Sequence, residues 1–157
     1  MFPSTTARVS NHTPEIINAR IYQRMLGRLD HYERNPQEIS HRLNQLDAEW
    51  DIERTLEANA STLILAFLVA GLVGGRRRTF LMAGGIAAFL LQHATQGWCP
   101  PVPLFRRFGY RTATEIETER YALMVLRGDF DDIQHDTDLA RVMVTLQRPR
   151  ETRERLR

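Results

Sequence analysis

The chain has 157 residues, of which 43% are hydrophobic and 25% are charged, and its formal net charge is +2. All 21 basic residues are arginine, and they are dispersed rather than gathered on one segment, so nucleic-acid binding is not indicated. The single cysteine excludes an intramolecular disulfide framework and a cysteine-rich metal site. A bias in codon usage is the simplest reading of the missing lysine, against a special need for guanidinium chemistry.

The apolar residues are concentrated in one block, although the mean hydropathy of the chain is negative. A globular protein distributes apolar residues over all its elements, because each element must bury one face. The block therefore predicts an all-α membrane protein with a two-helix transmembrane hairpin, residues 58–75 and 79–98, joined at Arg76-Arg77-Arg78. Each span just matches a hydrocarbon core of about 30 Å. A buried hairpin in a soluble core is the alternative, but the remaining sequence has little apolar surface to cover it.

Ahead of the hairpin, residues 1–13 are polar and predict a disordered lead-in without the features of a secretory signal. Residues 14–57 predict a polar and acidic helical segment, with one helix from Pro14 to Asn35-Pro36 and a second helix after it. Asn35 is expected to cap the second helix and Pro36 to be its first residue. The second helix is expected to be able to continue into the first span as one rod. The first helix is the expected packing partner for the apolar stripe of the second helix.

Apolar spacing gives the expected buried faces of these two helices. They are Tyr22, Met25 or Leu26, Leu29 and Tyr32 in the first helix, and Ile39, Leu43, Leu46 and Trp50 in the second. The opposite face of the second helix is acidic and carries Asp47, Glu49, Asp51, Glu53 and Glu57.

Beyond the hairpin, residues 99–147 predict an interfacial segment followed by C-terminal helices. Aromatic and basic side chains are expected at the membrane interface, as is usual for headgroup anchors. These are Trp98, Phe105, Arg106 and Arg107. Thr112 to Glu115 matches a capping box that opens a helix ending near Gly128, and a last helix starts at Asp136 or Asp138. Residues 148–157 form a basic tail, either solvated or in contact with anionic headgroups.

Four residues at one end of the hairpin are candidates for a functional or structural polar cluster. They are Gln92, His93, Gln96 and Cys99. An imidazole inside a span is a functional hypothesis by default, and interhelical hydrogen bonds with Asn59 and Thr62 are the structural alternative. Cys99 follows a helix C-terminus, where the helix dipole disfavours a thiolate, so a structural cysteine is favoured over redox or sulfur chemistry. No catalytic, cofactor-binding or metal-binding motif is expected.

Small residues recur every four positions in both spans. The rows are Ala66, Ala70 and Gly74 in the first span, and Gly84 and Ala88, with a parallel row of Ala83 and Ala87, in the second. Such rows let helices approach closely in lipid. Packing within the hairpin is the first interpretation, and homo-oligomerisation is the alternative.

The run from Glu53-Arg54 through the hairpin to Gly97-Trp98-Cys99-Pro100 resembles the DUF2892 family of small bacterial inner-membrane proteins. The hairpin of that family is also found attached to a rhodanese domain in YgaP-type proteins. The resemblance covers residues 52–105 and implies a bacterial inner-membrane protein of uncertain role. The rhodanese domain is missing here, so sulfur transfer does not carry over, and the triple-Arg turn departs from the family pattern.

The sequence therefore predicts a small multi-pass protein of the bacterial inner membrane that acts as a membrane-anchored helical interaction module. Its expected partners are the lipid bilayer and either a second copy or another protein, bound through the flanking helices. Flanking arginines outnumber those of the turn and favour both tails in the cytoplasm. A redox or sulfur-handling protein that uses Cys99 is the alternative function.

Overall fold

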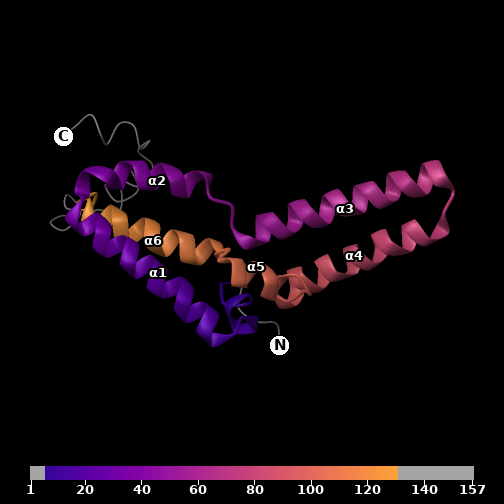
Figure 1. Ribbon diagram of the computed structural model, residues 1–157, viewed down its shortest axis with the longest axis horizontal. Helices are drawn as coiled ribbons and strands as arrows, with labels where there is room; N and C mark the ends of the chain where they lie inside the picture. Colours follow the sequence, from indigo (N-terminus) through magenta and orange to yellow (C-terminus); the bar gives the residue numbers. More distant parts are fainter. Residues whose placement is uncertain (1–5, 131–157) are drawn as a thin grey trace, which may run out of the picture.

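A computed structural model describes residues 6–130, which form helices and no strands. The elements in chain order are η1 (Ser10–His12), α1 (Glu15–Arg34), η2 (Pro36–Glu38), α2 (Ile39–Ala48), α3 (Ile52–Gly74), α4 (Arg77–Gln96), α5 (Val102–Phe108) and α6 (Ala113–Leu126). Helices α1, α2 and α6 form a helical body, and α3 and α4 project from it as a long arm with α5 at the junction (Figure 1). The all-α prediction is confirmed.

Helix α1 occupies the predicted segment, but its buried face is shifted. Ile17, Ile21 and Met25 are buried, whereas Tyr22 and Leu26 are exposed. The expected capping role of Asn35 is also wrong. Its side-chain amide donates to the His31 carbonyl oxygen at 2.8 Å, so it closes the end of α1 and does not cap the next helix.

Helix α6 supplies most of the partner surface for α2, in place of the expected α1. Ile39, Leu43 and Leu46 of α2 form one core cluster with three buried residues of α6. Those three are Ile116, Leu123 and Met124, with Leu29 and Tyr32 of α1 packed against the edge. Helix α6 lies between α1 and α2, so it is the central element of the body (Figure 1).

The expected continuous rod is interrupted between α2 and α3. Helix α2 ends at Ala48, and the Asp51 carboxylate caps α3 by accepting from the Arg54 backbone N–H at 2.6 Å. The Ile52 N–H is bound by the carbonyl oxygen of Arg111 at 2.8 Å. Trp50 is therefore exposed in the link, with the Arg54 guanidinium 4.3 Å from its ring centroid. A tertiary hydrogen bond and a local cap together break a segment that has no helix-breaking residue.

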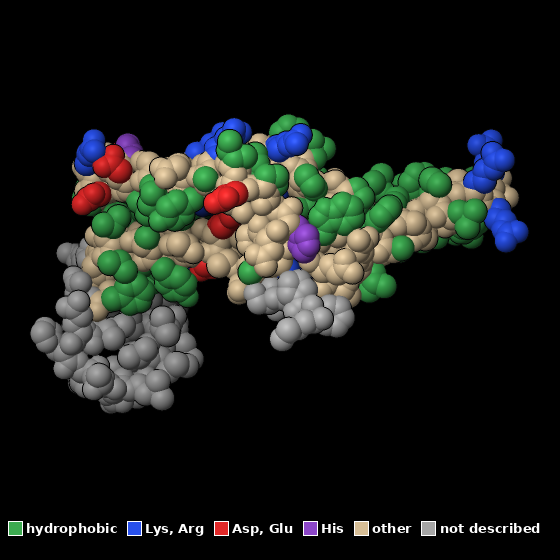
Figure 2. Space-filling view, turned by 90° about the horizontal axis from the view of Figure 1, so that it is seen from below, with side chains coloured by type: hydrophobic (Ala, Val, Ile, Leu, Met, Phe, Trp, Pro, Cys, Tyr) green, Lys and Arg blue, Asp and Glu red, His purple; other side chains and the backbone are tan. Residues whose placement is uncertain are grey.

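The two predicted apolar segments form an antiparallel pair of helices, α3 and α4, that contact each other along the arm. Gly75 makes the turn in the left-handed region, with φ of 60°, and Arg77 and Arg78 already belong to the first turn of α4. Hydrophobic side chains cover the visible face of the arm, and arginines mark its tip (Figure 2).

One helix within residues 6–130, the one that ends at Gly74, is long and apolar enough to cross a membrane. Only 11% of its apolar window is buried. The uninterrupted apolar run of α4, Phe80 to Leu91, is shorter, because Arg77 and Arg78 precede it and Gln92 and His93 follow it. A run of that length extends about 18 Å along a helix.

A second core lies where the arm meets the body. It contains Val9, Ile52, Leu56, Cys99 and Val102, with Phe105 packed against it. Val9 is 1% exposed, so the predicted disorder of residues 1–13 is wrong for its described part, residues 6–13. Burial of Val9, the ion pair of Arg8 with Glu53 and the hydrogen bond from Asn18 to the Ser10 carbonyl oxygen hold this segment.

Helix α6 opens with the predicted capping box between Thr112 and Glu115. It ends at Leu126, two residues before Gly128, whose φ is 79°. The expected last helix and the basic tail lie outside the described residues.

Candidate functional site at the base of the hairpin

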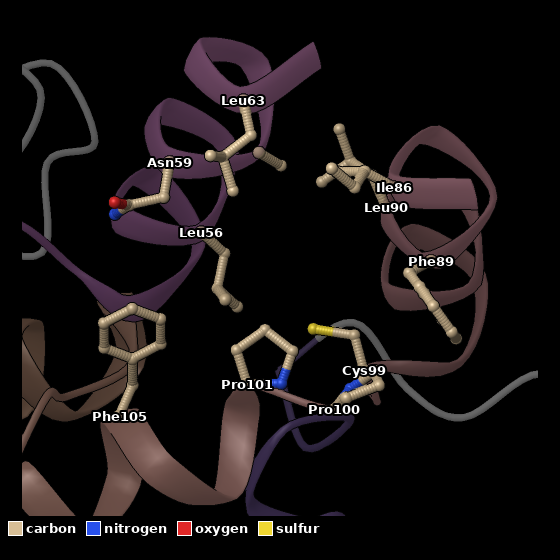
Figure 3. A pocket seen from close by; sticks show the side chains of 11 residues that line it. Leu56, Asn59, Leu63, Ile86, Phe89, Leu90, Cys99, Pro100, Pro101 and Phe105 are labelled. Atoms are coloured by element: carbon tan, nitrogen blue, oxygen red, sulfur yellow. The ribbon is translucent and has the colours of Figure 1, made fainter. Parts of the chain in front are cut away.

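An apolar cavity of about 350 Å³ opens where α3 and α4 separate near the body. Side chains from α3, α4, α5 and the Cys99–Pro101 link surround it (Figure 3). The lining residues are Leu56, Asn59, Ala60, Leu63, Ile86, Phe89, Leu90, Cys99, Pro100, Pro101 and Phe105. The walls offer dispersion contacts and almost no hydrogen bonds, so the cavity suits an apolar group such as an acyl chain.

Cys99 is the one nucleophilic side chain of this cavity, and it is not activated. Its side chain is buried, and burial raises the pKa of its thiol, which a hydrogen bond with the Val102 backbone only partly opposes. A protonated, enclosed thiol is a poor nucleophile. This environment supports the structural interpretation of Cys99.

The expected polar cluster around His93 does not form. His93 is 3% exposed, and neither ring nitrogen has a hydrogen-bond partner among residues 6–130. Asn59 donates to the Thr55 carbonyl oxygen at 2.7 Å, and Thr62 to that of Ala58 at 2.7 Å. Both side chains therefore donate to carbonyl oxygens of their own helix, which is a local alternative to the expected interhelical hydrogen bonds. Gln92 is half-buried and Gln96 is exposed, so neither shares the burial of His93.

The N-terminal segment covers the end of α4 next to His93. Arg8 donates to the Ala94 carbonyl oxygen at 3.0 Å and forms an ion pair with Glu53 of α3 at 2.7 Å. Gly97, with φ of 77°, allows this approach, because an added Cβ would lie 2.5 Å from the Arg8 Cβ. Arg8 thus fastens the two helices of the arm together at their base.

Of the four predicted interface anchors, Arg106 does not lie at the surface, so the prediction for it is wrong. Arg107 is exposed and Trp98 is half-buried, but Phe105 packs on the second core and Arg106 is fully buried. Arg106 forms two hydrogen bonds of 2.7 Å with the Glu115 carboxylate. It also contacts Thr13 Oγ1, Asn18 Oδ1 and the Tyr110 carbonyl oxygen. The planar guanidinium of Arg106 therefore binds the Glu115 carboxylate through two nitrogens, in place of the headgroup contact expected from sequence.

A buried ionic network around Glu119 escaped the sequence analysis. Glu119 is 0% exposed and accepts from Arg28 at 2.9 and 2.7 Å, from Arg42 at 2.9 Å, and from Arg111. Arg111 also holds Glu49 through hydrogen bonds of 2.8 and 2.6 Å. Burial raises the pKa of Glu119, but the hydrogen bonds from Arg28 and Arg42 and the charge of Arg111 outweigh burial and bring it to about 2.

Four of the five residues of the predicted acidic face are engaged in contacts within the molecule, and the fifth, Glu57, is exposed. Asp47 pairs with Arg120, Glu49 with Arg111, and Glu53 with Arg8, while Asp51 caps α3. These four carboxylates therefore do not form a free acidic face along one helix.

One sequence signal could have revealed the network. Glu115 and Glu119 are spaced four apart on the α6 face that also carries Ile116 and Leu123. A carboxylate on an apolar face needs a charged partner when it is buried. In this chain that partner has to be an arginine or a histidine, since lysine is absent.

The predicted small-residue rows do not make the contact between α3 and α4. The outward-facing positions are Ala66, Ala70, Gly74, Gly84 and Ala88, all exposed. Gly71 and Ala83 are the buried small residues. At Gly71 an added Cβ would lie 2.6 Å from Thr79 Oγ1, so the hairpin closes on this glycine. The row of Ala66, Ala70 and Gly74 and the row of Gly84 and Ala88 therefore do not pack within the hairpin, whereas Ala83 of the parallel row is buried. Homo-oligomerisation through the exposed rows stays a prediction.

Comparisons with family models, with curated proteins and with solved structures find no match for this chain. The resemblance to DUF2892 therefore stays a prediction. Within residues 6–130 no group of three His, Cys, Asp or Glu side chains is placed to hold a metal ion.

Proposed function

We propose that this chain is a membrane-anchored helical module. In this proposal α3 and α4 both cross the cytoplasmic membrane, and the helical body stands on the cytoplasmic side, where it binds a partner. The observation that carries the proposal is the exposure of large apolar side chains along the arm. These include Leu65, Val69, Leu72, Val73, Leu81, Met82 and Leu91.

The charge pattern along the arm supports insertion. Between Glu57 and Arg76 there is no ionisable residue, and the helical part of this interval, which ends at Gly74, extends about 26 Å. That distance is close to the thickness of a bilayer core of about 30 Å. Arg76, Arg77 and Arg78 are exposed at the tip, where long side chains reach headgroups while their stems stay in the apolar layer.

Pairing with α3 supports the crossing of α4 despite its shorter apolar run. Helix α4 contains 20 residues and therefore extends about 30 Å, as a span requires. Its polar ends coincide with the tip and the base of the arm, so they meet the two interfaces (Figure 1). Five arginines flank the apolar segments on the side of the body, against three at the tip, and arginine-rich flanks favour the cytoplasmic side. The five are Arg42, Arg54, Arg106, Arg107 and Arg111.

Cysteine accessibility tests the topology. In a Cys99→Ser background, Arg77→Cys reports the tip and Arg34→Cys reports the exposed end of α1. We expect an impermeant maleimide added to intact cells to label Arg77→Cys alone. In inside-out vesicles it should label Arg34→Cys alone. Labelling of both positions from one side would refute a crossing hairpin. It would favour an arm whose tip stays on the same side of the membrane as the body.

The binding surface of the body is proposed to lie on α6. Its acidic neighbours are engaged in ion pairs, whereas Tyr121 and Val125, four residues apart, are exposed on the helix face opposite Leu123. An exposed aromatic and aliphatic pair is typical of a protein contact. We expect Tyr121→Ser/Val125→Ser to reduce site-specific photo-crosslinking from residue 118 to a second copy or another protein in native membranes, with Tyr22→Ser as control.

The redox alternative has weaker support, because the Cys99 thiol is buried and its pKa is raised. Cys99→Ser should therefore leave membrane insertion unchanged, and the native protein in membranes should react slowly with maleimide.

A further inference from the structure

A polar pocket of about 140 Å³ lies in the helical body, away from the arm. Helix α1, helix α2 and the link between α5 and α6 enclose it. The lining residues are Ile21, Arg24, Arg28, Arg42, Glu49, Phe108, Gly109 and Arg111. Four arginines thus line one small space, and Arg24 is the exposed one among them.

The positive charge of this pocket is not fully neutralised by its neighbours. Glu49 and Glu119 are the carboxylates that contact its arginines, and both oxygens of Glu119 already accept from Arg28, Arg42 and Arg111. Four guanidinium groups facing two carboxylates leave an excess of two positive charges. Within residues 6–130, Arg24 has no hydrogen bond or ion pair.

The pocket is also held in shape. The buried Glu119 carboxylate fixes the three inner arginines, with Arg42 and Arg111 nearly buried, so their orientation is set before any ligand arrives. Arg24 reaches over Gly109, where φ is 92° and an added Cβ would lie 3.1 Å from Arg24 Nη1. A side chain at this position would push Arg24 away from the pocket.

We propose that this pocket binds a phosphate monoester dianion. Its charge of nearly −2 matches the excess of two positive charges. Arg24 can donate to phosphate oxygens, whereas Arg28, Arg42 and Arg111, whose nitrogens already donate to Glu119, Glu49 or Gln45, contribute positive charge from fixed positions. This prior fixation lowers the entropy cost of binding. The dianion can be a free phosphate monoester or the headgroup of a phosphatidate lipid, because both present the same oxygens. The proposal does not depend on membrane insertion, since no lining residue belongs to the arm.

Calorimetric titration of the full chain in neutral detergent, at constant ionic strength, tests the proposal. The probes are inorganic phosphate, dihexanoyl phosphatidate and, as a control, dihexanoyl phosphatidylcholine. Arg24→Gln removes the arginine that lacks a partner and should leave the ionic network intact. Arg20→Gln is the matched control, because Arg20 is exposed on the same helix one turn away and does not line the pocket.

Binding of phosphate or phosphatidate that Arg24→Gln weakens by about tenfold or more, and Arg20→Gln leaves unchanged, would support the site. Binding of both probes would identify a site open to soluble monoesters, and binding of phosphatidate alone would identify a lipid headgroup. The proposal is overturned if neither probe binds, if Arg24→Gln has no effect, if both variants lose affinity equally, or if phosphatidylcholine binds as well as phosphatidate.

Discussion

Arginine has a structural role in this chain that composition alone does not reveal. Arg28, Arg106 and Arg111 each use two nitrogens on one carboxylate, a geometry that a lysine ammonium does not provide. Biased codon usage remains a sufficient reason for the absence of lysine. At these positions, however, Arg→Lys is not a conservative change.

Glu119 is the residue whose loss should weaken the body most. Glu119→Gln leaves three guanidinium groups without their shared carboxylate, and breaking a buried pair in this way costs about 3–5 kcal/mol. Thermal unfolding in detergent, followed by circular dichroism, measures the effect. Glu117→Gln is the matched control on the same helix, because the Glu117 side chain is 47% exposed and its pair with Arg120 contributes little. Equal effects of the two substitutions would contradict the assigned role.

The same network predicts how stability depends on pH. The pKa of Glu119 is about 2 in the folded chain and 4.5 ordinarily, so the unfolded chain binds the proton first. The stabilisation by the carboxylate is therefore complete above about pH 4.5 and is lost as the pH falls towards 2. A shift of this size corresponds to about 3 kcal/mol. Thermal unfolding of wild type and Arg28→Gln between pH 7 and pH 2.5 should show a smaller pH dependence in the variant.

At the scale of elements, Gly71 of α3 lies directly against the side chains of Thr79 and Phe80 of α4. A Cβ at Gly71 would lie 2.8 Å from two ring carbons of Phe80, whereas a Cβ at Gly84 would meet nothing within 4 Å. Gly71→Ala should therefore force the tips of the two helices apart and lower thermal stability by about 1–3 kcal/mol. Gly84→Ala, the matched control, should be neutral or stabilising by up to about 1 kcal/mol through helix propensity. If Gly84→Ala destabilised the protein and Gly71→Ala did not, the two helices would contact each other through Gly84 and not through Gly71.

At the scale of the whole molecule, the proposed function places the arm in lipid and the body in water, so the same substitution should have different effects in the two parts. Val69 is 58% exposed on the arm, and Val125 is 63% exposed on α6. If the arm is in lipid, Val69→Arg places a charge in the hydrocarbon at a cost of about 2.5–3.5 kcal/mol and should reduce the fraction that resists carbonate extraction. Val125→Arg should leave that fraction unchanged. Retention of both variants in the membrane would argue that α3 does not lie in the bilayer.

Amino-acid order alone determined the elements that depend on local physics. The apolar block predicted α3 and α4, the Thr112–Glu115 spacing predicted the capping box, and the Asn35-Pro36 pair predicted the end of α1. Each depends on residues within a few positions of one another, so periodicity and capping chemistry suffice.

Only the tertiary structure decided what each face of these helices meets. It ended α2 at Ala48, placed Arg106 against Glu115 in the body, and buried Glu119 among arginines that lie up to 91 residues away in the chain. Within the hairpin it buried Gly71, which no predicted row contains, and Ala83, and left the other small residues of the predicted rows exposed. Partners of this kind are set by which helices pack together, and no local spacing records that choice. The apolar arm can thus be predicted from sequence, whereas the arginine pocket in the body emerges only when α1, α2 and the link between α5 and α6 come together.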